Sequence, residues 1–151
     1  MKIKRMVLFV FFIILFIKSL AYSQPPAPHN IPRITPQTIK ALISKGIKYV
    51  FVDCSTFGNS HICGAIYISY TWCPPYGKER IKNIKIPKDY YIFCYCTWPD
   101  EADSARVADY FIRKGYKAFA VKGGLMALKK AGFPACPGLL KDIYKKRKRR
   151  R

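Results

Sequence analysis

The arrangement best suited to chemistry in this chain is a cysteine that ends an apolar run and precedes a short polar loop and an amphipathic helix. The run covers residues 90–95, the cysteine is Cys96, and the helix is expected over residues 104–114. Such a thiol lies at the carboxyl end of a buried strand and beneath the N-terminus of a helix. Free N–H groups and the dipole of that helix favour a thiolate over a thiol. Cys96 is therefore the candidate nucleophile.

The loop after Cys96 supplies the groups expected around its sulfur. Its three acids raise the pKa of a neighbouring thiol if they point inward. If they point outward, the helix dipole and the N–H groups govern the sulfur, and the sequence leaves both alternatives open. The candidate loop residues are Thr97, Trp98, Asp100, Glu101, Ala102, Asp103 and Ser104.

Three further residues are candidates for supporting this site. Asp53 closes an apolar run, and Arg106 in the first turn of the helix has Asp53 or Asp103 as alternative partners with which to brace the loop. An exposed surface position for Arg106 is the competing interpretation. For His61 we favour a structural role over a role as general base.

The elements that must position these residues alternate along the chain. Thr35 and Pro36 are typical of a helix start, and Gly46 of its end. Apolar runs predict strands at residues 49–52, 65–68, 90–95 and 118–121, and a short helix is expected over 125–131. Helices alternating with fully apolar strands indicate a parallel sheet covered on both faces. Sites in such sheets form beyond the carboxyl ends of the strands, where Cys96 lies.

Four segments in matching order resemble a rhodanese domain over roughly residues 35 to 135. They are Val52-Asp53, His61-Ile62-Cys63-Gly64-Ala65, the Cys96-to-Arg106 unit, and the stretch from Val121 to Pro134 that contains Gly123-Gly124. The resemblance implies an α/β domain of three layers, α/β/α, with a five-stranded mostly parallel sheet. It also implies that Cys96 is the nucleophile, which takes sulfane sulfur from a donor such as thiosulfate as a persulfide and passes it to a thiophilic acceptor.

The loop departs from the usual rhodanese pattern Cys-x-x-Gly-x-Arg-Ser. It is two residues longer and contains neither glycine nor arginine, and it is more similar to variant loops of the form Cys-x-Cys-Pro-x-Glu-x-x-Ser, with Trp98 at the second cysteine. A phosphatase, which shares the fold, needs positive charge around its cysteine, so we reject that function. The alternative to a sulfurtransferase is a non-catalytic binding module or thiol-redox sensor of the same fold.

Six cysteines in an exported chain favour disulfides, and six allow 15 pairings. Cys73 and Cys136 both fall in expected loops and are one candidate pair. Cys94 shares a strand face with Cys96, and we favour a buried core position for it over a role as resolving thiol. The cysteines lack the paired spacing of a zinc site, so no metal and no cofactor is expected.

The two ends of the chain indicate export. A basic start, an apolar run over residues 6–17 and a small-x-small sequence predict a signal peptide over 1–23, with an uncleaved inner-membrane anchor as the alternative. A Pro-rich linker (24–34), the rhodanese-like domain (35–137) and a basic tail (138–151) are expected to follow. The predicted location is the periplasm or the extracellular space.

The net charge of +20 includes seven consecutive basic residues at 145–151. We interpret this block as a solvated tail, with an anionic membrane surface as its candidate partner. The body lacks basic and aromatic interleaving, so no nucleic acid is expected. The other expected partner is a small sulfur-containing substrate or thiol acceptor.

Overall fold

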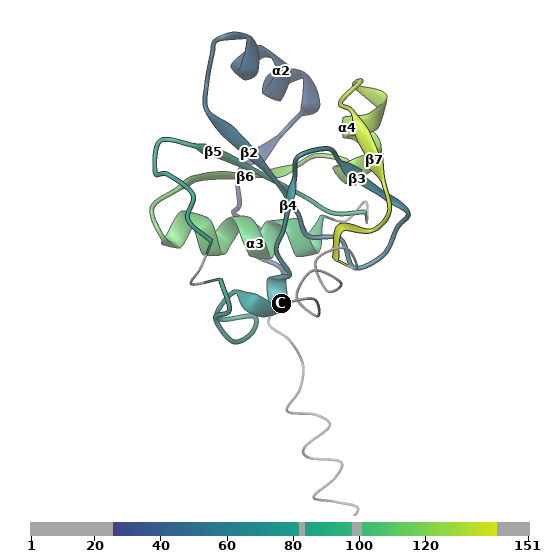
Figure 1. Ribbon diagram of the computed structural model, residues 1–151. Helices are drawn as coiled ribbons and strands as arrows, with labels where there is room; N and C mark the ends of the chain where they lie inside the picture. The colour runs from purple at the N-terminus through teal and green to yellow at the C-terminus, as the bar shows by residue number, and fades with distance from the viewer. Residues whose placement is uncertain (1–25, 82–83, 98–100, 142–151) are drawn as a thin grey trace, which may run out of the picture.

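The computed structural model describes residues 26–81, 84–97 and 101–141. Its centre is a five-stranded sheet whose neighbouring strands all run parallel (Figure 1). In spatial order the strands are β1 (Arg33–Ile34), β6 (Lys117–Val121), β5 (Tyr91–Tyr95), β2 (Tyr49–Asp53) and β4 (Ile66–Tyr67). The predicted α/β fold with a five-stranded sheet is confirmed.

The two central strands carry side chains to both faces because side chains alternate along a strand. Val52 and its register partner Cys94 belong to the core on one face, and Phe51 and its partner Phe93 belong to the core on the other. Both cores are apolar, which explains why these strands read as continuous apolar runs.

Three helices complete the layers. Helix α2 (Pro36–Ser44) and helix α4 (Gly124–Lys130) cover one face, and helix α3 (Ala102–Arg113) covers the other (Figure 1). The start of α2 is as predicted, since the Thr35 hydroxyl accepts a hydrogen bond from the Thr38 N–H at 3.2 Å. The three-layer α/β/α arrangement is thereby confirmed.

Helix α3 begins two residues before the predicted position. Glu101 precedes it with a left-handed backbone (φ 58°), and Ala102 is the first helical residue. The polar loop after Cys96 is therefore shorter than expected, and Asp103 lies inside the first turn of α3 rather than in the loop.

Residues at the two ends of the predicted domain also make contacts with the sheets. Strand β1 lies inside the range 24–34 that was predicted as a linker, and Pro32 already accepts a hydrogen bond from the Ala120 N–H. At the other end Gly138 donates its N–H to the Asn59 carbonyl at 2.7 Å, although 138 was the predicted first tail residue. Pairing with partners distant in sequence, which no local pattern reveals, fixes both boundaries.

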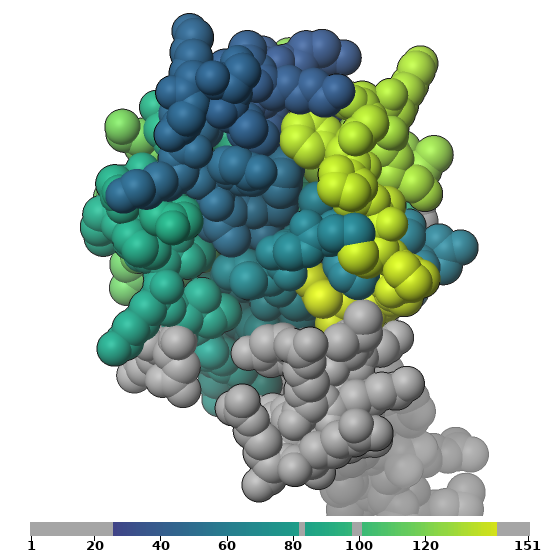
Figure 2. Space-filling model, turned by 45° about the horizontal axis from the view of Figure 1, so that its top comes forward, coloured from purple at the N-terminus to yellow at the C-terminus, as the bar shows by residue number. Residues whose placement is uncertain are grey.

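A small second sheet joins the carboxyl-terminal part to the segment after β2. Strand β3 (Ser60–Ile62) pairs antiparallel with β7 (Ala135–Pro137), with His61 opposite Cys136. Figure 2 shows the yellow carboxyl-terminal segment against the teal segment that contains β3. A short 3₁₀ helix, η1 (Tyr70–Trp72), follows β4.

The predicted signal peptide and most of the predicted basic tail lie outside the described residues. Within the described ranges, none of the helices has the length and apolar character needed to cross a membrane.

Candidate functional site

Cys96 follows directly on the last residue of β5 and is buried. Its carbonyl accepts a hydrogen bond from the Leu125 N–H at 3.0 Å, which ties the strand end to α4. Its Sγ donates to the Ser104 hydroxyl oxygen at 3.8 Å, and that hydroxyl donates to the Glu101 carbonyl at 2.9 Å. The thiol is thus held against the first turn of α3.

The first turn of α3 lies beside the sulfur of Cys96. The positive end of the helix dipole lies at the N-terminus of α3, and Ser104 belongs to that turn. Ser104 can also reverse its hydroxyl proton and donate to a charged sulfur. A helix N-terminus beside a thiol favours the thiolate, whereas the complete burial of Cys96 favours the thiol.

The carboxylate of Glu101 is engaged away from the sulfur. Its Oε2 accepts from Arg33 Nε at 2.7 Å, and its Oε1 accepts from the Gly123 N–H at 2.8 Å. Arg33 belongs to β1 and Gly123 precedes α4, so one side chain joins three elements to the end of the loop. Arg33 neutralises Glu101, so this acid of the loop does not place an unpaired charge beside the sulfur of Cys96.

Asp103 is neutralised in a second ion pair. Its Oδ1 lies 3.2 Å from Arg106 Nη1, and both side chains are largely buried. The Arg106 guanidinium also lies over the ring of Tyr70, 4.9 Å from its centroid. Of the two partners considered for Arg106, the structure therefore pairs it with Asp103, and the exposed-surface interpretation is wrong.

The beginning of the loop is tied to the segment after β2. Thr97 donates its hydroxyl to the Phe57 carbonyl at 2.7 Å. A Cβ on Gly58 would come within 3.4 Å of the same hydroxyl, and Gly58 has a positive φ of 129°. Trp98 and Asp100, two of the predicted loop residues, lie outside the described residues.

Asp53 lies at the end of β2, next to Tyr95 in the register. It is buried, and its Oδ1 accepts from the Ser55 N–H at 2.8 Å. Burial raises the pKa of this carboxyl, against the smaller opposing effect of its hydrogen bonds to Ser55. Asp53 shapes the turn after β2 and belongs to the supporting structure.

Two of the remaining thiols have raised pKa values. Burial, reinforced by the neighbouring thiol of Cys94, raises the pKa of Cys54 well above its usual range. Burial raises the pKa of Cys73 to about 12. Cys94 is buried in the core, as favoured from the sequence. Cys54 and Cys73 remain protonated at neutral pH and are poor nucleophiles.

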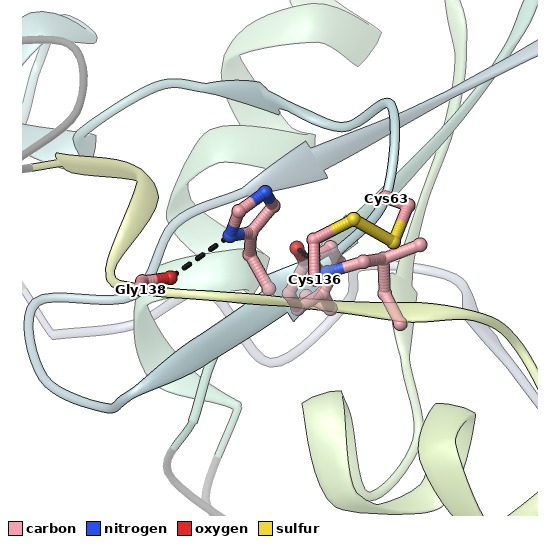
Figure 3. The surroundings of a disulfide bond; sticks show 6 residues. Cys63, Cys136 and Gly138 are labelled. Atoms are coloured by element: carbon pink, nitrogen blue, oxygen red, sulfur yellow. Dashed lines mark hydrogen bonds between the residues drawn. A yellow bond between two sulfur atoms is a disulfide. The ribbon is translucent and has the colours of Figure 1, made fainter.

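Cys136 forms a disulfide with Cys63, with an S–S distance of 2.04 Å (Figure 3). The candidate pair of Cys73 and Cys136 is therefore wrong, because the pairing of β3 with β7 brings Cys63 to Cys136 while Cys73 stays a buried thiol. All six cysteines are among the described residues, and the other four are not disulfide-bonded.

His61 lies beside this disulfide. Its Nδ1 is 2.9 Å from the Gly138 carbonyl oxygen, shown by the dashed line in Figure 3, and its side chain is buried. The imidazole thus fastens β3 to the chain after β7, which agrees with the structural role expected for it.

Sequence reasoning missed two residues of the site, Arg33 and Gly123. Arg33 was assigned to a linker, and Gly123 was expected only to make the turn into the last helix. Gly123 does make that turn, with φ 71°, and its N–H also binds Glu101. Strand β1 consists only of Arg33 and Ile34, and two residues are too few to form a recognisable strand pattern in the sequence. In the described part of the chain no three His, Cys, Asp or Glu residues are grouped to hold a metal ion.

No family model and no curated protein matches this sequence. Solved structures do match it. A rhodanese-related protein from Thermoplasma volcanium aligns with TM-score 0.52 and 17% identity over 70% of this chain and 97% of its own. A rhodanese-like domain protein from Staphylococcus aureus aligns with TM-score 0.50 and 22% identity over 65% and 91%. The BH2092 protein from Bacillus halodurans aligns with TM-score 0.55 and 21% identity over 72% and 78%. The chain therefore has the rhodanese-like fold.

Proposed function

We propose that this protein is a sulfurtransferase that carries sulfane sulfur as a persulfide on Cys96. The observation that carries the proposal is the contact between Cys96 Sγ and the Ser104 hydroxyl in the first turn of α3. In this contact, a thiol at the carboxyl end of β5 lies against the N-terminus of α3, within a rhodanese-like fold. Cys54 and Cys73 lack such surroundings and have raised pKa values.

The reaction consists of two displacements at sulfur. In the first, the Cys96 thiolate attacks the outer sulfur of thiosulfate, the S–S bond of the donor breaks, and sulfite leaves with the electron pair. In the second, an acceptor thiolate attacks the outer sulfur of the persulfide. The S–S bond to Cys96 breaks, its electron pair returns to Sγ, and the acceptor leaves as a persulfide. Neither step needs an external oxidant.

The ion pairs around the loop suit this chemistry because they remove negative charge from the neighbourhood of an anionic donor. Glu101 is paired with Arg33, and Asp103 with Arg106. An anionic nucleophile and an anionic donor repel each other, and unpaired carboxylates would add to that repulsion. The helix dipole and the Ser104 hydroxyl then stabilise the sulfur anion that each step forms.

Replacing the nucleophile tests the proposal. Cys96→Ser should abolish transfer of sulfur from thiosulfate to a thiol acceptor, while the matched variant Cys73→Ser should keep it. Cys73 is also buried, and its Sγ donates to the Ser69 carbonyl, a bond that serine can retain. Activity that survives in Cys96→Ser would refute the assignment.

A thiol-redox sensor is the second candidate, and one observation favours it. Cys54, Cys94 and Cys96 belong to one buried cluster, and the first two interact through their side chains. A sensor would show no turnover with any sulfane donor and would form a disulfide within this cluster on oxidation. A Cys54–Cys94 or Cys94–Cys96 disulfide in the oxidised protein, together with absent turnover, would favour the sensor over the transferase.

Export remains part of the proposal. The Cys63–Cys136 disulfide supports it, because disulfides persist in oxidising compartments and are rare in the cytosol. A mature N-terminus at residue 24 in the periplasmic or secreted fraction is the expected result, and an intact apolar segment in the membrane fraction would indicate the anchored alternative. Contact of the basic tail with anionic lipid is likewise a proposal.

A further inference from the structure

A hollow of about 280 Å³ lies beyond the carboxyl ends of β2 and β4. Three aromatic side chains line it, Tyr67, Tyr70 and Trp72, together with the hydroxyl-bearing residues Thr56 and Thr71 and the half-buried Lys141. Its volume is slightly below the range of roughly 300–1,000 Å³ that is typical of small-molecule pockets. It suits a ligand larger than an inorganic anion and smaller than a nucleotide.

The hollow lies on the side of the sheet edge where the Cys96 loop lies. Its wall residue Tyr70 stacks against Arg106, which holds Asp103 of the first turn of α3. Burial raises the pKa of its wall residue Tyr67 to about 12, and the neighbouring Cys54 and Asp103 add to this rise. Cys54 in turn donates its N–H to the carbonyl of Tyr95, the residue before Cys96. Two short chains of contacts therefore connect the hollow with the first turn of α3 and with the residue before Cys96.

The walls are held in place without a ligand. Tyr67 and Trp72 meet edge to face with centroids 5.4 Å apart, and the Ser69 and Thr71 hydroxyls are 2.8 Å apart. A Cβ on Gly77 would come within 1.9 Å of the Thr71 carbonyl oxygen, so only glycine allows this close approach behind η1. A wall fixed in advance loses little entropy when it binds a ligand.

The chemistry of the lining defines the ligand class. Aromatic rings favour an organic body, the hydroxyl groups of Thr56 and Thr71 favour polar groups, and the Lys141 ammonium favours a negative charge. We infer that this hollow binds a low-molecular-weight organic thiol with a carboxylate, which is the sulfur acceptor of the proposed transferase. The Lys141 ammonium binds the carboxylate.

This inference rests on the proposed function, since the acceptor attacks the outer sulfur of the Cys96 persulfide. The bond formed joins that sulfur to the acceptor, and the bond broken is the one to Cys96. Binding itself needs no reaction, so it can be measured separately.

A fluorescence titration tests binding without turnover. In the full chain carrying Trp98→Phe, Trp72 is the remaining tryptophan, and 3-mercaptopropanoate should change its emission with a saturable curve. Lys141→Gln should weaken that affinity about fivefold, the effect of losing one partly exposed ion pair of about 1 kcal/mol. The uncharged 2-mercaptoethanol should bind equally to both forms, and Lys130→Gln, on α4, should bind 3-mercaptopropanoate like the parent protein.

Kinetics separate this inference from the proposed function. If turnover occurs, Lys141→Gln should raise the KM for 3-mercaptopropanoate about fivefold with little change in kcat. An equal rise in the KM for thiosulfate would show general attraction of anions and would overturn the acceptor site. Titrations that show no saturable, Lys141-dependent binding would overturn it too. Absent turnover with normal binding would refute the transferase and leave the hollow as a carboxylate-binding site.

Discussion

At the scale of single residues, the thiol of Cys96 is set apart by its contact with a helix N-terminus. Cys54, Cys73 and Cys94 are buried as deeply, and the pKa values of Cys54 and Cys73 are raised by burial. Cys96 has the Ser104 hydroxyl and the first turn of α3 beside its sulfur. Burial raises the pKa of a thiol, whereas a helix N-terminus beside it lowers that pKa.

Asp53 gives a pH-dependent prediction at the same scale. Burial raises the pKa of this carboxyl, so the folded state holds the proton more tightly than the unfolded chain. The resulting stability is fully present below the unfolded pKa of about 3.9 and is lost as the pH rises through the folded pKa. Asp53→Asn removes the titration and keeps an acceptor for Ser55. Relative to the parent protein, the variant should gain unfolding free energy between about pH 4 and pH 7.

Urea unfolding of both proteins at the two pH values measures this difference. Asp89→Asn is the control of opposite sign, because the hydrogen bond from Lys48 lowers the pKa of Asp89. That variant should lose stability relative to the parent as the pH rises. A difference for Asp53→Asn that does not change with pH would contradict the account of this residue.

At the scale of elements, hydrogen bonds to distant parts of the chain fix both ends of the loop after Cys96. Thr97 bonds the segment after β2, and Glu101 bonds both Arg33 of β1 and the N–H that precedes α4. Glu101 also has the left-handed backbone that turns the loop into α3. The position of α3 against the sulfur therefore depends on β1, at the far edge of the sheet.

A double-mutant cycle on Glu101→Gln and Arg33→Gln measures this dependence. The pair is largely buried and short, and we expect a coupling of about 1–2 kcal/mol in unfolding free energy. The exposed pair Lys48 and Asp89, at a similar distance of 2.8 Å, should show a much smaller coupling because solvent screens it. Equal coupling in the two cycles would mean that Glu101 does not act as a buried anchor.

At the scale of the whole molecule, the Cys63–Cys136 disulfide closes a loop that contains most of the parallel sheet. The two cysteines are 73 residues apart, and the bond joins the segment after β2 to the chain after α4. A cross-link over such a distance removes much conformational freedom from the unfolded chain. The disulfide, the β3–β7 pairing and the His61 contact together fasten the carboxyl-terminal segment.

Loss of this disulfide should lower the unfolding free energy by about 2–4 kcal/mol. The double variant Cys63→Ser/Cys136→Ser tests this in a urea unfolding experiment, with Cys73→Ser as the control that leaves the bond intact. The parent protein should lose the same stability in the presence of a reductant, and the double variant should be insensitive to it. Unchanged stability on reduction of the parent would contradict this role.

Much of the layered fold was predictable because its cause is local. Apolar runs predicted β2, β5 and β6, and the Thr35 and Pro36 pattern predicted α2. Strand β1 and the disulfide pairing were not predictable, since both depend on contacts between distant segments. For the site, the positions of Cys96 and Ser104 followed from the strand and helix pattern. The neutralisation of Glu101 did not, because Arg33 lies 68 residues away in sequence.

The central claim is that Cys96 carries the transferred sulfur. Mass spectrometry of the full chain after reaction with thiosulfate, with alkylation and peptide mapping, tests it most directly. We predict a gain of one sulfur atom on the peptide that contains Cys96, and its loss on addition of an acceptor thiol. A gain on a different cysteine, or no gain in protein with a reduced Cys96, would contradict the account.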